Sequence, residues 1–443
     1  MAFDRSSAAD WYRRNRARSR ALFDLISADA YYSQPIALRH PIVFYEGHLP
    51  AFSFNTLVKR ALGRPSIDAR LEALFARGID PHESAAASGD AARATSRTSA
   101  LWPAREEVHR FAEEADRQVI EALERAELER PGDPLLDRAE AVFTILEHEA
   151  MHQETLLYMW HRLPLAEKRA PAGYRPRVDG VSPRQEWVEV PAGCATLGVA
   201  RDAVPFGWDN EHPSLSAQVP AFSIDRHDVT NDQFREFVNA GGYRQREWWR
   251  AEDWEWIQRE NIEHPLFWER HHAAWQWRAM FELVPLPGAW PVYVSQAEAA
   301  AYARWRGARL PSEAEFQRAA YGSSDGERPH PWGDAVADES RGVFDFASWD
   351  PEPAGTHPKG TSAWGIHDLV GNGWKWTSTP FAPFPGFVAM ASYPEYSADF
   401  FDGEHIVMKG ASPATARELL RPSFRNWFRA RYPYVYATFR CVR

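Results

Sequence analysis

Apolar residues in the first third of the chain recur every three or four positions, which is the period of an amphipathic helix. This pattern predicts helices over four segments: 8–28, 35–62, roughly 103–128 and roughly 134–162. We expect Pro50, inside the second segment, to interrupt that helix or to begin a new turn. The small and polar stretch 79–99 predicts a loop. Four helices with two longer connections indicate a helix bundle, in which inward side chains can build a metal site.

The pattern changes after residue 163, where Pro, Gly and charged residues become frequent. We therefore place a linker at 166–185, between a helical domain over 1–165 and a second domain over 186–443. The second domain contains short β-like runs separated by long loops: EWVEVPAG, QVPAFSIDRHDVT, PVYVS, HIVMKGA and YATFRCVR. Two helical stretches, NDQFREFVNAG and SQAEAAAYARWRG, interrupt these runs and carry helix-start signals. The expected fold class is α+β.

The composition is that of a soluble globular protein, with 44% hydrophobic and 25% charged residues among 443. A net charge of -10 argues against a general nucleic-acid binder and against docking on anionic membranes. The N-terminus lacks the apolar core of a signal peptide, and no stretch approaches the roughly 18 apolar residues of a membrane span. Two cysteines cannot form a disulfide framework. We expect a cytoplasmic protein with no nucleic-acid or membrane partner.

Tryptophan is unusually abundant. The chain has 20 tryptophans, and eight of them lie between Trp248 and Trp290. Aromatic residues at this density suit a rigid, loop-rich fold whose long connections are anchored by large side chains. They suit a pocket for a cation equally well.

The strongest local signal is the segment EHEAMHQET, in which His148 and His152 stand one helical turn apart. Two histidines at this spacing lie on one helix face, so both imidazoles can reach one metal ion. Apolar residues follow on the same face at three- and four-residue steps: Val142, Ile145, Leu156 and Met159. The histidines therefore point into the bundle, where unpaired polar rings would be costly and a metal ion would satisfy them. The alternative is a pair of core histidines that are hydrogen-bonded to neighbouring carboxylates.

HEAMH also matches the HExxH motif of zinc proteases, in which Glu149 would be the general base and zinc would hold the catalytic water. The extended form of that motif requires glycine and histidine where this chain has Thr155 and Tyr158. The remainder of the chain does not resemble a protease, so we do not favour this interpretation.

A third ligand should come from another helix of the bundle. The histidines available in the first domain are His40, His48, His82, His109 and His161. We favour His48 because it lies in the apolar helical segment FYEGHLPAFSFNTL, whereas His161 lies near a helix end. Three neutral histidines leave coordination positions open for substrate and O2. The residue types alone do not select iron over zinc or manganese.

A series of short motifs is spread in order over both predicted domains. The first domain has YEGHLPAF, with His48, and the run His148, His152 and Glu154. The second domain has DVTNDQFREFV, ARLPSEAEFQRAA, GNGWKWTSTPF, YPEYS and FRNWF with FRCVR. In these motifs the chain resembles the ergothioneine-type sulfoxide synthases, which are hercynine-using non-heme iron enzymes. The resemblance implies an N-terminal DinB-like four-helix bundle and a C-terminal formylglycine-generating-enzyme-like domain related to C-type lectins.

The resemblance implies that iron(II) binds to His48, His148 and His152. It also implies that the substrates are O2, a thiol and hercynine, the Nα-trimethylated betaine of histidine. In the family, a bond forms from sulfur to imidazole C2 of hercynine, and the product is a sulfoxide. An open three-histidine site can admit such exogenous ligands.

The resemblance also implies roles for residues of the second domain. Tyr393 and Tyr396 of YPEYS match the family's active-site tyrosine pair, and Tyr393 would donate a proton or hydrogen atom to the reacting oxygen. Asn426 and Trp427 match positions near the substrate's trimethylammonium group, where a tryptophan face suits a quaternary ammonium. The alternative is that the tyrosines pack a lectin-like loop and that Trp427 is one more core aromatic residue.

The chain departs from the mycobacterial-type pattern in two places. Trp427 is followed by Phe428 rather than by an acidic residue, and then by Arg429 and Arg431, which we predict to bind substrate. Met151 stands where those enzymes carry glutamine. An acidic partner for the amine of γ-glutamylcysteine is therefore missing. The pattern looks more like the selenoneine synthase branch, whose members form a carbon–selenium bond between hercynine and a selenosugar, 1-seleno-glucose.

Three alternatives remain. Cysteine or another thiol could be the donor, as in ergothioneine-type synthesis. A second alternative is a non-catalytic lectin-like module fused to a metal-stabilised bundle, whose structural ion would be closed by a fourth protein ligand. The third is a formylglycine-generating enzyme, which would use C-terminal cysteines for copper, and Cys194 and Cys441 do not suit that role.

Overall fold

The computed structural model describes residues 4–76, 102–272 and 274–443, and these form two compact units. Unit 1 comprises Met1–Tyr174 together with the tripeptide Ala391–Tyr393. Unit 2 comprises Arg175–Met390 and Pro394–Arg443. Unit 1 is helical and unit 2 mixes helices with short strands, so the predicted α+β fold class is confirmed. The loop predicted at 79–99, with His82, lies outside the described residues.

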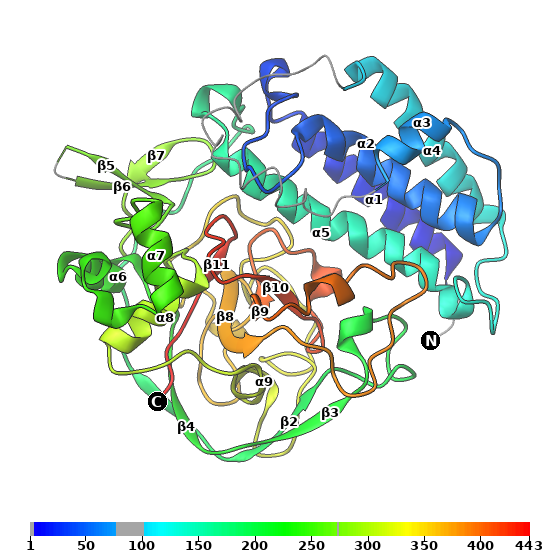
Figure 1. Ribbon diagram of the computed structural model, residues 1–443. Helices are drawn as coiled ribbons and strands as arrows, with labels where there is room; N and C mark the ends of the chain where they lie inside the picture. The colour runs from blue at the N-terminus through cyan, green and yellow to red at the C-terminus, as the bar shows by residue number, and fades with distance from the viewer. Residues whose placement is uncertain (1–3, 77–101, 273) are drawn as a thin grey trace. The chain divides into compact units, whose positions relative to one another are not determined.

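The described part of unit 1 is built around a bundle of helices (Figure 1). Its helices are α1 (Arg5–Phe23), α2 (Ile42–Ser53), α3 (Ala69–Leu74), α4 (Arg105–Arg125) and α5 (Glu140–Arg162). A π-helix, Phe54–Ala61, continues α2. Short 3-10 turns join the other elements: Ala28–Ala30, Asp137–Ala139 and Leu165–Glu167. Both α1 and α2 pack against α4 and α5. The buried faces meet in an apolar core that includes Tyr12, Leu57, Val119 and Ile145.

The second predicted helix, 35–62, differs from its prediction in where it begins and in the effect of Pro50. It begins at Ile42 rather than at 35, because Pro41 precedes it and a residue before proline is disfavoured in helical conformation. Pro50 lies inside the helix and does not interrupt it. A proline removes one helical hydrogen bond, but every residue of α2 is buried, and packing outweighs that loss. The hydrogen bonding then widens to the π pattern from Phe54 onward.

The fourth predicted helix, roughly 134–162, corresponds to α5 and also begins later than predicted, at Glu140. Arg138 and Ala139 have φ angles of 54° and 56°, and left-handed backbone interrupts a right-handed helix. From Glu140 the helix α5 runs without a break to Arg162, and most of its residues are buried. It is therefore the central element that carries the HEAMH segment.

The largest sheet in the described part of unit 2 has the strand order β10–β9–β8–β11. Its strands are β8 (Gly373–Pro380), β9 (His405–Ala411), β10 (Asn426–Arg429) and β11 (Ala437–Thr438). The pairings are antiparallel except for β11, which runs parallel to β8. Among the described residues, two smaller antiparallel sheets pair β1 (Trp187–Val190) with β4 (Phe222–Asp225) and β2 (Gly193–Leu197) with β3 (Leu215–Val219). In another sheet, β6 (Ala274–Arg278) is the central strand and pairs antiparallel with β5 (Trp268–His271) and β7 (Leu283–Pro285).

The helices of unit 2 are α6 (Asn231–Asn239), α7 (Ala251–Arg259), α8 (Gln296–Trp305) and α9 (Glu313–Tyr321). The two helices that the sequence predicts are confirmed as α6 and α8, and each begins with a capping box. Short 3-10 turns complete the unit: Asp209–Glu211, Gly242–Arg244, Arg246–Trp248, Pro358–Gly360, Ala398–Phe400 and Arg417–Leu419.

The strand predicted at PVYVS (291–295) is wrong. Val292 donates its backbone N–H to Val229, whereas Val294 donates to Ala437. The segment therefore bonds in turn to two different neighbours, and a strand requires continuous pairing with one of them. Its apolar side chains are buried, which explains why the sequence looks like a strand.

The tryptophan-rich segment folds into α7 and the β5–β6–β7 sheet. Trp268, Trp277 and Trp290 are fully buried, and the rings of Trp277 and Trp290 meet edge to face at 5.7 Å. The indole N–H of Trp268 donates to the Oδ1 atom of Asn231 on α6, at 3.0 Å. These three tryptophans therefore anchor irregular chain to the body of unit 2.

Three charged residues are buried together, one of them on β8 of the largest sheet, and we call them the Asp228 network: Asp228, Lys375 and Arg440. Arg440 donates to the Oδ1 atom of Asp228 at 2.6 Å, and Lys375 Nζ lies 3.3 Å from its Oδ2 atom. One carboxylate thus faces two cations. Buried charges persist in a protein when they are paired in this way.

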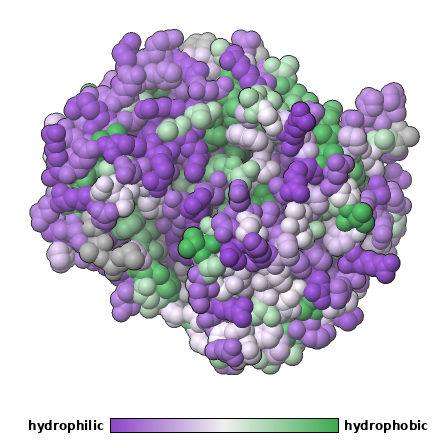
Figure 2. Space-filling view, turned by 180° about the vertical axis from the view of Figure 1, so that it is seen from behind, coloured by the Kyte–Doolittle hydropathy of each residue, from purple (hydrophilic) through white to green (hydrophobic). Residues whose placement is uncertain are grey.

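The surface carries few exposed large apolar side chains. Among the described residues these are Val181, Leu215, Val336 and Val388. Figure 2 shows a mostly hydrophilic face on which apolar residues are scattered. No helix in the described ranges combines the length and the apolarity that crossing a bilayer requires.

Candidate metal centre

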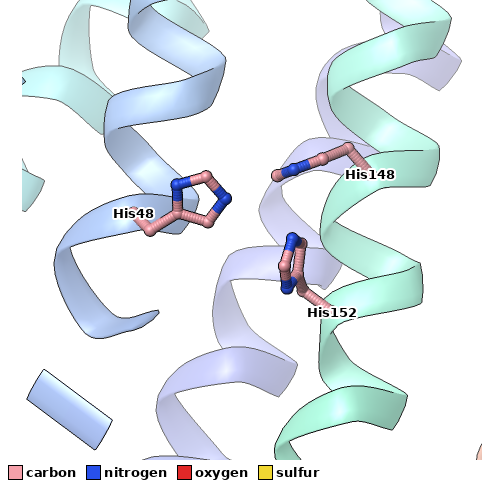
Figure 3. A group of neighbouring side chains, drawn as sticks. All are labelled: His48, His148 and His152. Carbon is pink, nitrogen blue, oxygen red and sulfur yellow. The ribbon is translucent and has the colours of Figure 1, made fainter. Parts of the chain in front are cut away.

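The structure brings three histidines together inside unit 1, as the sequence predicts. His48 projects from α2, and His148 and His152 project from consecutive turns of α5 (Figure 3). One ring nitrogen from each lies within 4.8 Å of the others. His48 and His148 are buried and His152 is half-buried. Within the described ranges, no other set of three histidine, cysteine, aspartate or glutamate residues brings its ligand atoms this close together.

A backbone carbonyl orients the first of these rings. His48 Nδ1 lies 2.7 Å from the carbonyl oxygen of Phe75, just after α3. A carbonyl oxygen can only accept, so Nδ1 must carry the proton, and the lone pair of the ring is on Nε2. Histidine ligands commonly donate their second N–H to such a carbonyl, which fixes both the tautomer and the ring orientation.

Four ring nitrogens of these histidines have no hydrogen-bond partner among the described residues. These atoms are Nε2 of His48, both ring nitrogens of His148 and Nδ1 of His152. Buried polar atoms left in this state are costly, and a metal ion that accepts their lone pairs would remove the cost. The donor set therefore fits a divalent metal. Core histidines bonded to carboxylates, the alternative open from the sequence, are not what the structure shows.

The local environment keeps the three rings uncharged. Burial lowers the pKa of His48 to about 4. Burial, followed by the neighbouring histidine rings, holds the pKa of His148 well below its usual range. The pKa of His152 is also well below its usual range, because of burial and then of His48. Neutral imidazole is the form that binds a metal, so these residues are ready to bind at neutral pH.

Aromatic rings line the site within unit 1. The Phe52 ring stacks on His148 with centroids 3.5 Å apart, and Phe44 stacks on His48 at 5.0 Å. Tyr393, from the tripeptide that belongs to unit 1, meets Phe52 at 5.1 Å and His148 at 5.9 Å. A tyrosine far away in the sequence thus lies beside His148.

Glu149 does not face the metal site, which argues against the zinc-protease interpretation. Its carboxylate accepts hydrogen bonds from Arg16 at 2.9 Å and Ser19 at 2.6 Å, both on α1. Burial raises the pKa of Glu149, although Arg16 opposes that shift. Adjacent residues on a helix point in different directions, so the neighbour of His148 turns toward α1. Glu149 is a structural residue of the bundle.

The other candidate histidines of the first domain are placed elsewhere. His40 stacks on the Phe44 ring with centroids 4.1 Å apart, outside the three-histidine group. His109 lies partly exposed on α4, 3.1 Å from a carboxylate oxygen of Glu46. His161 is buried near the end of α5. The preference for His48 therefore agrees with the geometry.

The other predicted site residues lie in unit 2 and remain predictions. Tyr396 stacks on Trp208 at 3.9 Å and meets Trp427 at 5.1 Å. Trp427 in turn stacks on Phe381 at 4.2 Å. Asn426, at the start of β10, accepts the backbone N–H of Trp427 at 2.9 Å. These contacts form an aromatic cluster of the kind that can receive a cationic ligand.

The two predicted arginines are engaged with carboxylates. Arg431 donates to Asp253 at 2.9 Å, and Arg429 lies 3.7 Å from Glu404. Sequence reasoning did not find the Phe75 carbonyl, because every residue has one and only folding decides where it points. Phe52 and Phe44 could have been found, since each stands four residues from His48.

Two protein families match most of the chain. Residues 176–443 match the Sulfatase-modifying factor enzyme 1-like domain, and residues 12–156 match the DinB superfamily. The chain is 38% identical over 295 residues to the hercynine oxygenase of Mycolicibacterium smegmatis, covering 64% of this chain and 67% of that protein. It is 37% identical over 334 residues to the hercynine oxygenase of Mycolicibacterium thermoresistibile, covering 72% and 71%. The chain belongs to the ergothioneine-type enzyme family.

The family likeness reaches a fungal protein as well. Ergothioneine biosynthesis protein 1 of Neurospora crassa is 28% identical over 493 residues, covering 93% of this chain and 54% of the fungal protein. The chain thus spans about half of that longer relative. These matches confirm the predicted pairing of a DinB-like bundle with a formylglycine-generating-enzyme-like domain in an ergothioneine-type enzyme.

Proposed function

We propose that this chain is a non-heme iron(II) enzyme that uses O2 to join imidazole C2 of hercynine to the selenium of a selenosugar. The observation that supports this most is a largely buried group of three neutral histidines in a chain related to hercynine oxygenases. Iron(II) bound to them would supply open coordination positions and electron transfer to O2. The stoichiometry is balanced: one selenol, one imidazole C–H and one O2 give one selenoxide and one water.

The residues of unit 1 would prepare the site for this reaction. The Phe75 carbonyl holds the His48 ring so that Nε2 faces the site. Phe44 and Phe52 cover two of the ligand rings, which restricts the access of water. Tyr393 would hold a transferable proton on its phenolic oxygen beside His148.

The residues of unit 2 would recognise hercynine. Trp427 would present its ring to the trimethylammonium group, which has no N–H to donate and is attracted to an aromatic face. Tyr396 and Phe381 hold the Trp427 ring from two sides. Asn426 would contribute an amide to the polar end of the substrate.

The donor is the finer part of the proposal. No acidic residue follows Trp427, and Asp253 is already paired with Arg431 at 2.9 Å, so this carboxylate is not available to the amine of a dipeptide. This favours a neutral donor such as a selenosugar. The names of the relatives favour the second candidate, a thiol such as cysteine, which would undergo the same reaction with sulfur in place of selenium.

The deciding experiment is an aerobic assay with iron(II) and hercynine, in which selenoglucose, cysteine and γ-glutamylcysteine compete. Mass spectrometry of the products identifies the donor. A predominantly selenium-containing product supports the first candidate, and a cysteine adduct supports the second. No adduct with any donor would contradict the proposed function and would favour a binding module.

The metal ligands are tested by His148→Ala, which we expect to abolish both iron binding and turnover. His109→Ala is the matched control, because His109 lies on α4, partly exposed and outside the ligand group. Bound iron is measured with a chromogenic chelator after gel filtration. Full turnover of His148→Ala without bound iron would remove iron from the reaction.

The role of Tyr393 is tested by Tyr393→Phe. The variant keeps the ring contacts with Phe52 and His148 but loses the phenolic proton. We expect hercynine binding to stay close to wild type while the oxidation slows or yields a different product. An unchanged product distribution and rate would exclude Tyr393 as proton donor.

A further inference from the structure

We propose that three side chains of unit 1 position Tyr393 at the metal site by binding the backbone and hydroxyl of its neighbour Ser392; this role rests on the proposed function. We call these side chains the Ser392 clamp: Arg60, Glu140 and Thr144. They are positioning residues that act through Tyr393, and none of them belongs to the three-histidine group.

The buried half of the clamp lies on α5. Glu140 Oε1 accepts from the backbone N–H of Ser392 at 3.2 Å and from its hydroxyl at 3.0 Å. The Thr144 hydroxyl lies 2.8 Å from the Ser392 hydroxyl. Ser392 and Thr144 have no exposed surface, and Glu140 is 6% exposed. A carboxylate buried to this extent is stabilised by the donors that Ser392 supplies.

The outer half of the clamp is Arg60, in the π-helix that continues α2. Its guanidinium donates to the carbonyl of Ser392 at 3.1 Å and to the carbonyl of Ala391 at 3.0 Å. The backbone N–H and C=O of Ser392 are thus both bound by side chains. The tripeptide lies in neither a helix nor a strand, so these side chains replace the hydrogen bonds of regular structure.

The clamp and the three histidines come from α5 and from the continuous helical run of α2 and its π-helix. Thr144 stands one helical turn before His148 on α5. Arg60 follows Phe52 along the helix that carries His48. Tyr393 is bonded directly to Ser392, and its ring meets Phe52 and His148 at 5.1 and 5.9 Å. A fixed Ser392 therefore fixes the tyrosine relative to the metal ligands. Displacement by about 1 Å is enough to slow a reaction roughly 100-fold.

The test places 3-fluorotyrosine at position 393 and measures its ¹⁹F signal with and without Co(II). In the wild-type protein we expect Co(II) to shift or broaden the signal strongly, because the ring lies next to a ligand ring. Arg60→Ala and Thr144→Val should lose most of that effect while Co(II) affinity, followed by visible absorption, stays within about twofold. Thr144→Ser keeps the hydroxyl and should restore the effect. Arg64→Ala is the matched control, since Arg64 pairs with Glu121.

Two outcomes would overturn the clamp: a Co(II) effect of equal size in Arg60→Ala and Thr144→Val, or a wild-type signal that bound Co(II) leaves unchanged. Arg60 is an exposed side chain, so its variant should fold even if Thr144→Val does not. The measurement uses no substrate. A protein that shows the expected Co(II) effects but forms no hercynine adduct would support the clamp and contradict the proposed function. A protein that forms the adduct although its Tyr393 ring is displaced would support the proposed function and contradict the clamp.

Discussion

Gly47→Ala should weaken metal binding although no ligand is changed. Gly47 precedes His48 on α2, and a Cβ atom at this position would lie 2.5 Å from the Cε2 and Cζ atoms of Phe75. Normal carbon contacts begin near 3.5 Å, so the Phe75 ring must move. Its space is limited, because Phe44 and Phe111 surround it with ring centroids 6.1 and 6.3 Å away. The movement reaches the Phe75 carbonyl, which orients His48.

The magnitude follows from two opposing terms. Overpacking a buried site costs about 1–3 kcal/mol, and replacing a helical glycine by alanine returns about 0.5–1 kcal/mol. We therefore expect the free energy of unfolding to fall by about 1 kcal/mol. Disturbing a group that orients a metal ligand lowers metal affinity by roughly 10- to 100-fold, and this is the larger effect.

The assay is an anaerobic titration of Fe(II) against a chelator of known affinity. The control is the double variant Gly47→Ala with Phe75→Leu, in which a smaller side chain makes room for the new methyl group and the backbone carbonyl remains. We expect the double variant to bind iron more tightly than Gly47→Ala alone. Wild-type affinity in Gly47→Ala, or losses that simply add in the double variant, would refute this reasoning.

Asp228→Asn should lower the free energy of unfolding by about 3–5 kcal/mol in a urea titration, since two buried cations lose their shared carboxylate; a loss under about 1 kcal/mol would contradict this. Burial lowers the pKa of Lys409 to about 8, so the folded protein releases this proton before the unfolded chain does. The melting temperature should therefore rise from pH 8 toward pH 10 in the wild-type protein and should rise less in Lys409→Met. Exposed Cys194 should react with a thiol reagent in the native protein, whereas Cys441, whose pKa burial raises, should react only after unfolding. Rapid reaction of both cysteines in the folded protein would contradict this prediction.

Local spacing was sufficient to predict the paired histidines. The i, i+4 spacing of His148 and His152 and the apolar residues around them depend on helix geometry alone, and α5 has that geometry. The capped helices α6 and α8 were predictable for the same reason. The segment PVYVS was not, because its apolar pattern reports burial and cannot report which neighbour accepts its hydrogen bonds.

The sequence by itself determined the helix face on which His148 and His152 stand and singled out His48 as an unexpected polar residue in an apolar segment. The tertiary structure decided the rest of the site. Packing of α2 against α5 brings the third nitrogen to the other two, and the turn after α3 brings the Phe75 carbonyl to His48. The tertiary structure also places Tyr393 in unit 1. These contacts join residues far apart along the chain, and such contacts depend on how whole elements pack and not on any local period.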